Sequence, residues 1–497
     1  MKMDLKNFKS EPDVHVYEKS ITQDGNSTFF MIRDGLESFL IVHPADEMQG
    51  STEFDGEWQE FDDTRFLKCP LSAKNAAVLR EKFPFTRPVL IGKQNSYGLG
   101  DRLGNAGPAH LKAIRKTSFK PVLAQQSIRE LERTNRTAQE VMDAASWAVF
   151  REGYKDGFGA DGDHLKTTDD IDLMMKAGFT MFTIDPSDFV VNEAVEMDEN
   201  QLLEEIKRMP WDVLNSDFEE FSAKWFDHQI KLSEDFTLKP ARNEIMAGLV
   251  KYGRVISHTK ILAGYIKNRY PEHPAELELS VDETDQPTTL FEHYLIASEL
   301  HRLGVELVSL APRFCGDFEK GVDYRGDLDQ FKNEYLQHLA IARQFGGYKL
   351  SIHSGSDKFS VYETIGSLNE GSVHVKTAGT SYLEALRTVA EAAPDLFREI
   401  LAFSKTRFAN DKKTYHISSR PENVPKGETL KDHQLKELLD DDDARQVLHV
   451  TFGSVLGGDS SRSIKLKEKL MRCLAENETL YERNLEKHFY RHLRSFN

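Results

Sequence analysis

Histidines and a glutamate stand where three short apolar segments of the chain end. His164 follows the first segment in GADGDHLK, Glu283 follows the second in SVDETD, and His353 closes the third in KLSIH. Imidazole nitrogen and carboxylate oxygen together suit a divalent transition metal that keeps an open position for substrate. We therefore predict one divalent metal ion (Zn, Mn, Co or Ni) held by His164, Glu283 and His353. For each residue alone, the alternative is an ordinary polar group at the start of a loop.

Other polar side chains follow the same kind of segment and are candidates for proton transfer or substrate binding. Asp163 is the main proton-transfer candidate, with Asp317 or Asp185 as a partner on the opposite face of the substrate. Asp161 and His449 are possible additional site residues, although His449 lies between apolar neighbours and is equally a candidate structural histidine. The candidates for binding substrate are Lys166, Arg313, Ser354, Ser356, Lys376 and Thr380.

Lys376, at the end of HVKT, has two alternative roles. A buried lysine of lowered pKa could form a Schiff base with a keto-sugar. The many carboxylates expected near it favour the charged ammonium, so binding of an anion is the preferred interpretation. The run from Ser354 to Lys358 adds hydroxyl and amide donors for a carboxylate, a phosphate or sugar hydroxyls. It lacks the GxxxxGK[ST] spacing of a nucleotide site.

These residues can meet only if the segments before them are neighbouring strands. From Ser118 onward, short apolar runs alternate with helical patterns, which predicts an α/β fold of the (β/α)8 TIM-barrel type. In such a barrel the residues after all strands converge on one mouth. The predicted strands are Phe119–Gln126, Asp156–Gly162, Thr180–Pro186, Ala275–Glu283, Val305–Phe314, Tyr348–Gly355, Val373–Gly379 and Arg445–Gly453.

The first barrel strand is the least certain part of this assignment, because Val89–Lys93 is also strand-like. The segment Ser96–Gly104 is glycine-rich and is expected to be a loop, since it lacks the strand–GxGxxG–helix context of a dinucleotide site. A doubly wound open sheet would need such a glycine-rich loop after its first strand, and PVLAQQSIREL has none. We therefore expect no nicotinamide cofactor.

Three regions are expected along the chain. Residues 1–110 form a strand-rich N-terminal cap region, 111–460 the catalytic barrel, and 461–497 a C-terminal helical extension. Two insertions, at about 192–274 and 408–444, follow barrel strands and are expected to cover the mouth.

Composition excludes several functional classes. The 497 residues carry a net charge of −17, which disfavours binding to nucleic acid or to anionic membranes. The three cysteines are far apart and fit a reducing compartment. No apolar run is long enough to span a membrane, so we expect a cytoplasmic enzyme, either a monomer or a homo-oligomer, that acts on a small molecule.

Seven segments of the chain carry a family resemblance: SYGLGDRLG, LAQQSIREL, GADGDHLK, SVDETDQPTTLFEH, APRFCGDFEKGVDY, KLSIHSGSDKFSVY and HVKTAGTSYLEAL. Together they resemble the tagaturonate epimerase family of hexuronate catabolism. The resemblance implies a metal-dependent epimerase of a ketose or keto-uronate, acting on D-tagaturonate/D-fructuronate or on D-tagatose/D-fructose at C4. The pair Asp163-His164 is also similar to the Asp-His pair of class II aldolases, in which the histidine binds metal and the aspartate handles a hydroxyl proton.

The chemistry of C4 favours a retro-aldol route. In a 2-ketose C4 is β to the carbonyl, so its hydrogen is not acidified and enolisation cannot invert it. Cleavage of the C3–C4 bond, rotation of the aldehyde fragment and re-addition to its opposite face would invert C4. This route needs a metal ion to hold the enediolate and acid/base groups to move the hydroxyl proton. The competing hypotheses are a class II-type metal-dependent aldolase or lyase on a related sugar, which releases both fragments, and a non-catalytic sugar-binding barrel.

Overall fold

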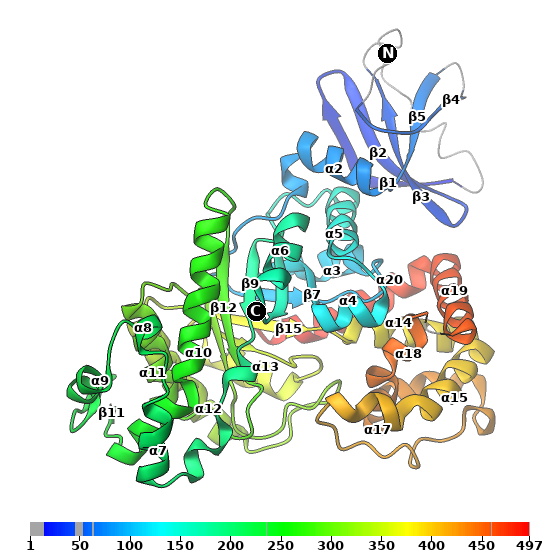
Figure 1. The fold of residues 1–497 in the computed structure, drawn as a ribbon. Coiled ribbons are helices and arrows are strands. Elements are labelled where there is room, and N and C mark those ends of the chain that lie inside the picture. The colour runs from blue at the N-terminus through cyan, green and yellow to red at the C-terminus, as the bar shows by residue number, and fades with distance from the viewer. Residues whose placement is uncertain (1–13, 45–52, 62–63, 235, 459, 497) are drawn as a thin grey trace.

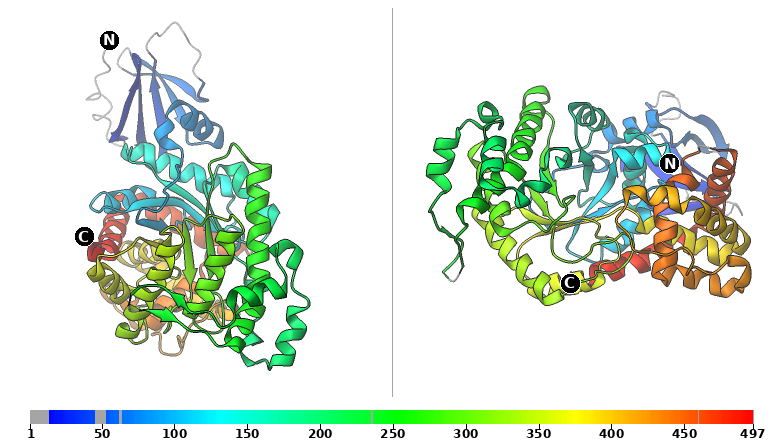
Figure 2. Two further views of the ribbon diagram at one scale, coloured as in Figure 1. Left: turned by 90° about the vertical axis from the view of Figure 1, so that its left-hand side faces the viewer. Right: turned by 60° about the horizontal axis from the view of Figure 1, so that its bottom comes forward.

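The computed structural model describes residues 14–44, 53–61, 64–234, 236–458 and 460–496. Its elements form an N-terminal antiparallel sheet, a central barrel and a group of C-terminal helices (Figure 1). Figure 2 shows the N-terminal sheet (blue) projecting away from the barrel, whereas the C-terminal helices (orange and red) pack along it. In this part of the chain no helix is long and apolar enough to cross a membrane.

Eight parallel strands close into a barrel in the order β12-β13-β14-β15-β6-β7-β8-β9, which confirms the predicted (β/α)8 TIM-type fold. Several of these strands are buried along their whole length, because helices cover the outside of the barrel and side chains fill its inside. The strands are β6 (Ser96–Leu99), β7 (Lys120–Ser127), β8 (Gly159–Leu165), β9 (Met181–Ile184), β12 (Glu276–Val281), β13 (Ser309–Pro312), β14 (Lys349–Ile352) and β15 (Val373–Thr377).

Helices follow the strands and cover the barrel, and two more helices end the chain. Helix α20 packs against α3 and α14, so the C-terminus closes part of the outer layer. The helices are α3 (Gly107–Ile114), α4 (Ile128–Thr134), α5 (Ala138–Glu152), α6 (Thr168–Ala177), α11 (Leu290–Arg302), α12 (Leu328–Gln344), α13 (Phe359–Leu368), α14 (Thr380–Ala392), α19 (Ser461–Glu476) and α20 (Glu478–Leu493).

The predicted strand Arg445–Gly453 is wrong, because this segment forms helices α17 (Asp442–Val450) and α18 (Phe452–Leu456). Its β-branched and apolar residues are typical of a strand. However, the side chain of Asp441 accepts a hydrogen bond from the amide of Ala444 and caps a helix at this point. His449 therefore reaches the barrel from a helix and not from a strand end.

The first barrel strand is β6, which lies in the glycine-rich segment Ser96–Gly104 that we expected to be a loop. A Cβ at Gly98 would lie 2.4 Å from Oε1 of Gln125 on β7. Glycine therefore permits close packing inside the barrel here and does not mark a turn. Val89–Lys93, the other strand-like segment, forms no strand.

The N-terminal sheet has the strand order β1-β2-β3-β5-β4 and packs on helix α5 of the barrel. The ring of Phe83 lies 5.1 Å from that of Phe29 and 5.4 Å from that of Phe150 on α5. The Tyr17 hydroxyl donates to Glu478 Oε1 on α20 at 2.9 Å. The strands are β1 (Val14–Asp24), β2 (Ser27–Asp34), β3 (Glu37–His43), β4 (Glu57–Phe61) and β5 (Thr64–Pro70), with α2 (Ala73–Lys82) after them.

The two long insertions differ in their relation to the barrel mouth. Residues 192–274 fold around an apolar cluster of their own, and none of their described residues lines the mouth cavity. Residues 408–444 contribute Thr414, Tyr415 and His416 to that cavity, so only this insertion covers it as expected. The helices are α7 (Glu199–Ile206), α8 (Trp211–Leu214), α9 (Phe218–Trp225) and α10 (Arg242–Arg269) in the first, with α15 (Pro394–Asp411) before and α16 (Asp432–Leu435) within the second.

A chain of buried polar groups between α11, α12 and β14 makes the stability of the fold depend on pH. His293 Nδ1 lies 2.8 Å from His338 Nδ1, and His293 Nε2 lies 2.6 Å from the Tyr348 hydroxyl. Burial lowers the pKa of His338 to about 3. In the unfolded chain the same imidazole takes up a proton near pH 6.5. The neutral, buried His338 therefore makes its full contribution to the free energy of unfolding above that pH, and this contribution is lost as pH falls toward 3.

We expect the free energy of unfolding to fall below pH 6.5, with His338 contributing about 1.4 kcal/mol per pH unit. Denaturant unfolding followed by circular dichroism between pH 7 and pH 4.5 measures this. His338→Gln should be less stable at pH 7 but show a shallower slope. A variant with the wild-type slope would contradict this role of His338.

Candidate active site

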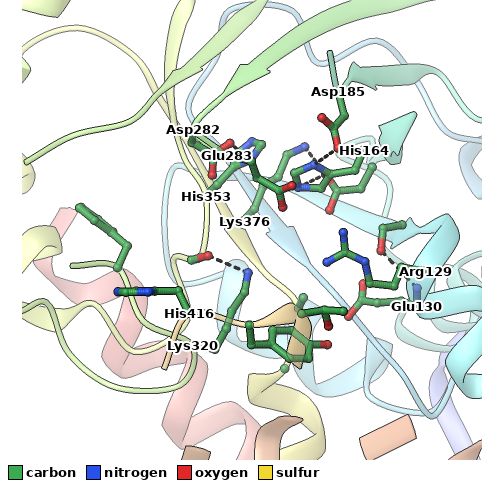
Figure 3. A pocket seen from close by; sticks show the side chains of 18 of the residues that line it. Arg129, Glu130, His164, Asp185, Asp282, Glu283, Lys320, His353, Lys376 and His416 are labelled. Atoms are coloured by element: carbon green, nitrogen blue, oxygen red, sulfur yellow. Dashed lines mark hydrogen bonds and ion pairs between the residues drawn. The ribbon is translucent and has the colours of Figure 1, made fainter. Parts of the chain in front are cut away.

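A cavity of about 810 Å³ opens among the residues that follow the barrel strands (Figure 3). Two predicted site residues are not among those that line it: Asp161 is buried against Lys376, and Thr380 donates to Asp357 at 3.4 Å. The predicted residues that do line it are Asp163, His164, Lys166, Asp185, Glu283, Arg313, Asp317, His353, Ser354, Ser356, Lys376 and His449.

His164, Asp185 and Glu283 form a group that could hold a metal ion. One ligand atom from each residue lies within 4.8 Å of the others, and His164 Nδ1 is 3.3 Å from Asp185 Oδ2. The three residues follow or end strands β8, β9 and β12, so the barrel fixes their spacing. One imidazole and two carboxylates fit a divalent transition metal and leave positions free for substrate.

His353 lies beside this group but is held by other carboxylates. Its ring centroid is 5.3 Å from that of His164. Its Nε2 lies 2.7 Å from Glu278 Oε1, and its Nδ1 lies 3.1 Å from Asp282 Oδ1. The geometry therefore groups Asp185, predicted as a proton-transfer residue, with His164, whereas His353 bridges Glu278 and Asp282.

The carboxylates concentrate positive charge on both imidazoles. Burial alone would lower the pKa of His164, but Asp163 and the hydrogen bond to Asp185 raise it to about 9. Burial likewise opposes the charge on His353, yet Asp282 and Glu278 raise its pKa to about 10. Negative charge at this end of the cavity is thus strong enough to hold a cation, either protons on the imidazoles or a metal ion.

The backbone at two cavity residues is strained. His164 has φ 52° and Ser354 has φ 51°, which is the left-handed region that side chains other than glycine rarely adopt. Each such residue costs about 1–3 kcal/mol and persists only where the surrounding structure holds it. At these two positions the strained backbone sets the direction in which the side chain enters the cavity.

Lys376 lies at the centre of a buried ion cluster inside the barrel. Its Nζ is 2.7 Å from Asp161 Oδ2 and 2.8 Å from both Asp163 Oδ1 and Glu278 Oε1. Burial opposes its charge, but these three carboxylates raise the pKa of Lys376 well above its usual range. The amine is therefore protonated, which is unfavourable for a Schiff base, and its donors are already engaged.

Several residues in or beside the cavity could not be found by reading strand ends. Glu278 lies inside strand β12, and only its polar character within ELELSV could have marked it. Asp161, in contrast, is among the residues predicted from the sequence, and burial raises its pKa to about 6 although Lys376 is adjacent. Arg129 on α4 and Tyr415 from the second insertion also line the cavity, and no motif in the sequence distinguished them.

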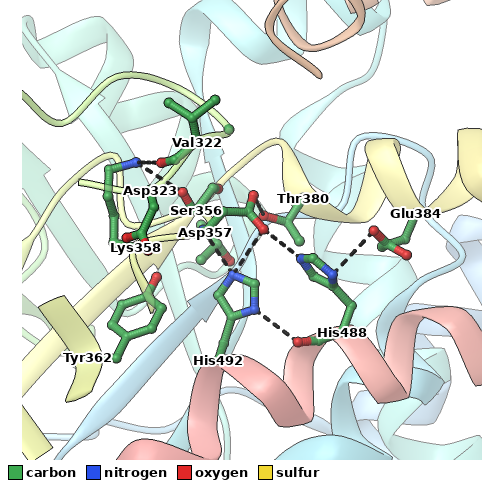
Figure 4. A network of polar contacts seen from close by, with 12 residues as sticks. Val322, Asp323, Ser356, Asp357, Lys358, Tyr362, Thr380, Glu384, His488 and His492 are labelled. Carbon is green, nitrogen blue, oxygen red and sulfur yellow. Dashed lines mark hydrogen bonds and ion pairs between the residues drawn. The ribbon is translucent and has the colours of Figure 1, made fainter. Parts of the chain in front are cut away.

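The described residues contain a second group of ligand-type side chains, outside the cavity, at Asp357, His488 and His492 (Figure 4). His488 Nε2 donates to Asp357 Oδ1 at 2.7 Å, and the Asp357 amide donates to His492 Nε2 at 3.0 Å. Arg445 Nη2 lies 2.6 Å from the other oxygen of Asp357. The guanidinium already neutralises this carboxylate, so the group is best explained as a structural link from α20 to the loop after β14.

Comparisons with known proteins concern the chain as a whole. The chain matches the model of the tagaturonate epimerase family over residues 17–496. It is 41% identical over 495 residues to the tagaturonate/fructuronate epimerase of Thermotoga maritima, covering 99% of both chains. The native crystal structure of fructuronate-tagaturonate epimerase UxaE from Cohnella laeviribosi is 37% identical, with a TM-score of 0.89 and 99% and 98% of the two chains covered. A glycerol-complexed structure of that protein is 38% identical, with the same TM-score and 97% and 96% covered.

The geometry predicts which substitutions would empty the candidate metal site. We expect Asp185→Asn and Glu283→Gln to lose most of the bound metal, because each removes a carboxylate oxygen from the group around His164. His353→Gln should keep it, since His353 is held by Glu278 and Asp282. Metal content after reconstitution and dialysis, measured by mass spectrometry, tests this.

His416→Ala is the matched control, because His416 lines the same cavity on the exposed second insertion. It should bind metal as the wild type does. Loss of metal from His353→Gln with full occupancy in Asp185→Asn would instead support the ligand set expected from the sequence.

Proposed function

The chain belongs to the tagaturonate epimerase family, and we propose that it interconverts D-tagaturonate and D-fructuronate by inverting C4 with one divalent metal ion. The observation that carries this proposal is the group His164–Asp185–Glu283 beside the ionised Asp163 in one cavity. A metal-binding group next to a base supplies the parts that retro-aldol chemistry needs. The named substrates of the Thermotoga maritima and Cohnella laeviribosi relatives support the choice of a keto-uronate.

His164, Asp185 and Glu283 would hold the metal, which when bound acts as a Lewis acid toward the carbonyl and adjacent hydroxyl oxygens of a 2-ketose. Asp163 would accept the proton of the C4 hydroxyl. As that proton leaves, the oxygen electron pair forms the C4 aldehyde, the C3–C4 bond breaks, and its electrons move to the ketone fragment. Re-addition to the opposite face of the aldehyde returns the proton and completes the inversion.

The surroundings of Asp163 keep its carboxyl group ionised. Burial favours its neutral form, but Lys376 and His164 outweigh it and hold the pKa of Asp163 below its usual range. Asp163 is thus a carboxylate at neutral pH and can accept a proton. Asp317, 3.5 Å from His416 Nε2 at the cavity mouth, is the proposed second proton-transfer group.

We expect Asp163→Asn to lower kcat by roughly 10²–10⁴-fold while metal content stays at the wild-type level, because only proton transfer is lost. Conversion of tagaturonate followed by NMR measures kcat, and metal analysis of the same sample gives the occupancy. Asp188→Asn is the matched control, since Asp188 is exposed and pairs with Lys166. If Asp163→Asn instead empties the site, Asp163 is a ligand.

The route itself is tested by isotopes at C3 and C4. Retro-aldol cleavage never breaks the C4–H bond, so carbon-13 at C3 or C4 should slow the reaction and deuterium at C4 should have only a small secondary effect. A large primary deuterium effect at C4 would contradict the route. The same NMR experiment separates an epimerase from an aldolase, because free three-carbon products would accumulate only with an aldolase.

A further inference from the structure

We propose that the part of the cavity formed by Lys320, Ser354, His449 and the N-terminus of helix α14 binds the carboxylate of the uronate substrate. This inference rests on the proposed function and names the groups that would select a uronate over a neutral ketose. Figure 3 shows Lys320 and His416 in a different part of the cavity from His164 and Asp185. Both sets of residues line the same cavity, so one substrate molecule could contact the metal-binding group and this subsite together.

His449 is the residue that points to a ligand. Its side chain is 1% exposed, it lines the cavity, and neither ring nitrogen has a hydrogen-bond partner among the residues that the structure describes. Leaving a buried polar group unpaired costs about 1–3 kcal/mol. A ligand with acceptor oxygens would remove this cost by accepting the imidazole N–H.

The imidazole stands against the start of α14. A Cβ at Gly379, the N-cap residue, would lie 1.8 Å from His449 Nε2, so glycine is required for the ring to approach the backbone there. With no side chain at the N-cap, no side-chain hydrogen bond caps this 13-residue helix. Its first amides and its dipole favour an anion. The loops after β14 and β15, the seventh and eighth barrel strands, are where TIM barrels commonly bind anions.

Lys320 supplies the net positive charge. Its Nζ donates to Ser354 Oγ at 2.7 Å, and within the described parts of the chain no carboxylate lies at ion-pair distance from it. The two nearby arginines, in contrast, are neutralised: Arg102 pairs with Glu130 at 2.9 Å and Arg445 with Asp357 at 2.6 Å. Burial, followed by the adjacent cations, lowers the pKa of His449 well below its usual value, so it is a neutral donor.

Buried hydrogen bonds hold the loops that carry Lys320 and Ser354 in place. The buried ammonium of Lys358 donates to the carbonyls of Glu319 at 2.7 Å and Ser356 at 3.1 Å, which joins the loop bearing Lys320 to the loop bearing Ser354 (Figure 4). Asp357 adds the link to His488 on α20 described above. A preorganised anion site loses less free energy on binding than a flexible one.

Charge then determines the orientation of the substrate. At the metal-binding end, Asp163, Asp185 and Glu283 offset the charge of Lys376 and of a bound metal ion, whereas at the other end the ammonium of Lys320 has no carboxylate partner in the described chain and can attract the substrate carboxylate. A uronate is therefore expected to bind with its ketone at the metal group and its carboxylate at Lys320. A neutral ketose gains nothing from this subsite.

The test compares substrates that differ at C6. In Lys320→Met, kcat/KM for tagaturonate relative to that for tagatose should fall roughly 10–100-fold, as expected for a lost charge-assisted hydrogen bond. The change should be mainly in KM for the uronate, because the contact holds substrate before and during the reaction. Lys332→Met, on α12 and outside the lining of the cavity, is the control and should leave the ratio unchanged.

His449→Leu provides an independent readout. It should lower the same ratio without lowering the unfolding temperature, since the imidazole forms no hydrogen bond within the described chain. An unchanged ratio in both variants would overturn the subsite while leaving the proposed function intact. Wild-type preference for tagatose 6-phosphate over tagaturonate would assign the subsite to a phosphate and overturn the proposal. Absence of wild-type turnover of tagaturonate would overturn the proposed function and the subsite together.

Discussion

The mouth of the barrel brings carboxylates so close together that positive charge must lie among them. Asp161, Asp163 and Glu278 converge on the single ammonium of Lys376. Asp185 and Glu283 surround His164. Buried charges of one sign are tolerated only when neutralised or protonated. The raised pKa values of the two imidazoles and of Lys376 have this common cause.

The distribution of carboxylates also distinguishes a lysine with a structural role from one that is available to a ligand. Lys376 is protonated and fully bound by carboxylates, so its role is to keep Asp163 ionised and the cluster compact. Lys320 has a hydroxyl partner and no ion-pair partner in the described chain, which leaves its charge available to a ligand. The sequence alone does not distinguish the two lysines, because the difference depends on residues that follow other strands.

Much of the fold follows from local pattern, because strands buried on both faces read as apolar runs. β6 escaped prediction because Gly98 and Gly100, which resemble a turn, serve close packing against Gln125 and Thr377. The residues of α17 predict a strand because many of them are apolar or β-branched. They are buried against the core from a short helix instead. Neither error changes where the mouth of the barrel is predicted to lie, because seven of the predicted strands overlap barrel strands.

The sequence brings the candidate residues to one cavity, whereas their grouping within it depends on the folded structure. His164, Glu283 and His353 all line one cavity, as strand-end reasoning requires. Which carboxylate faces which imidazole depends on side-chain directions set by the strained backbone at His164 and by the offsets of β8, β9 and β12. Glu278 could not be identified in this way, because it projects from within a strand and not from its end.

An epimerase that breaks a carbon–carbon bond must keep both fragments, and this is what distinguishes it from an aldolase. In the proposed arrangement the ketone fragment is retained at the metal-binding end, and the aldehyde fragment is retained by its carboxylate at Lys320 and His449. Anchoring at a charge two bonds from the aldehyde carbon leaves rotation about the intervening bond free. The aldehyde can then present its other face without leaving the cavity. The separation of an acidic and a basic end within one cavity is thus the structural condition for inversion without release.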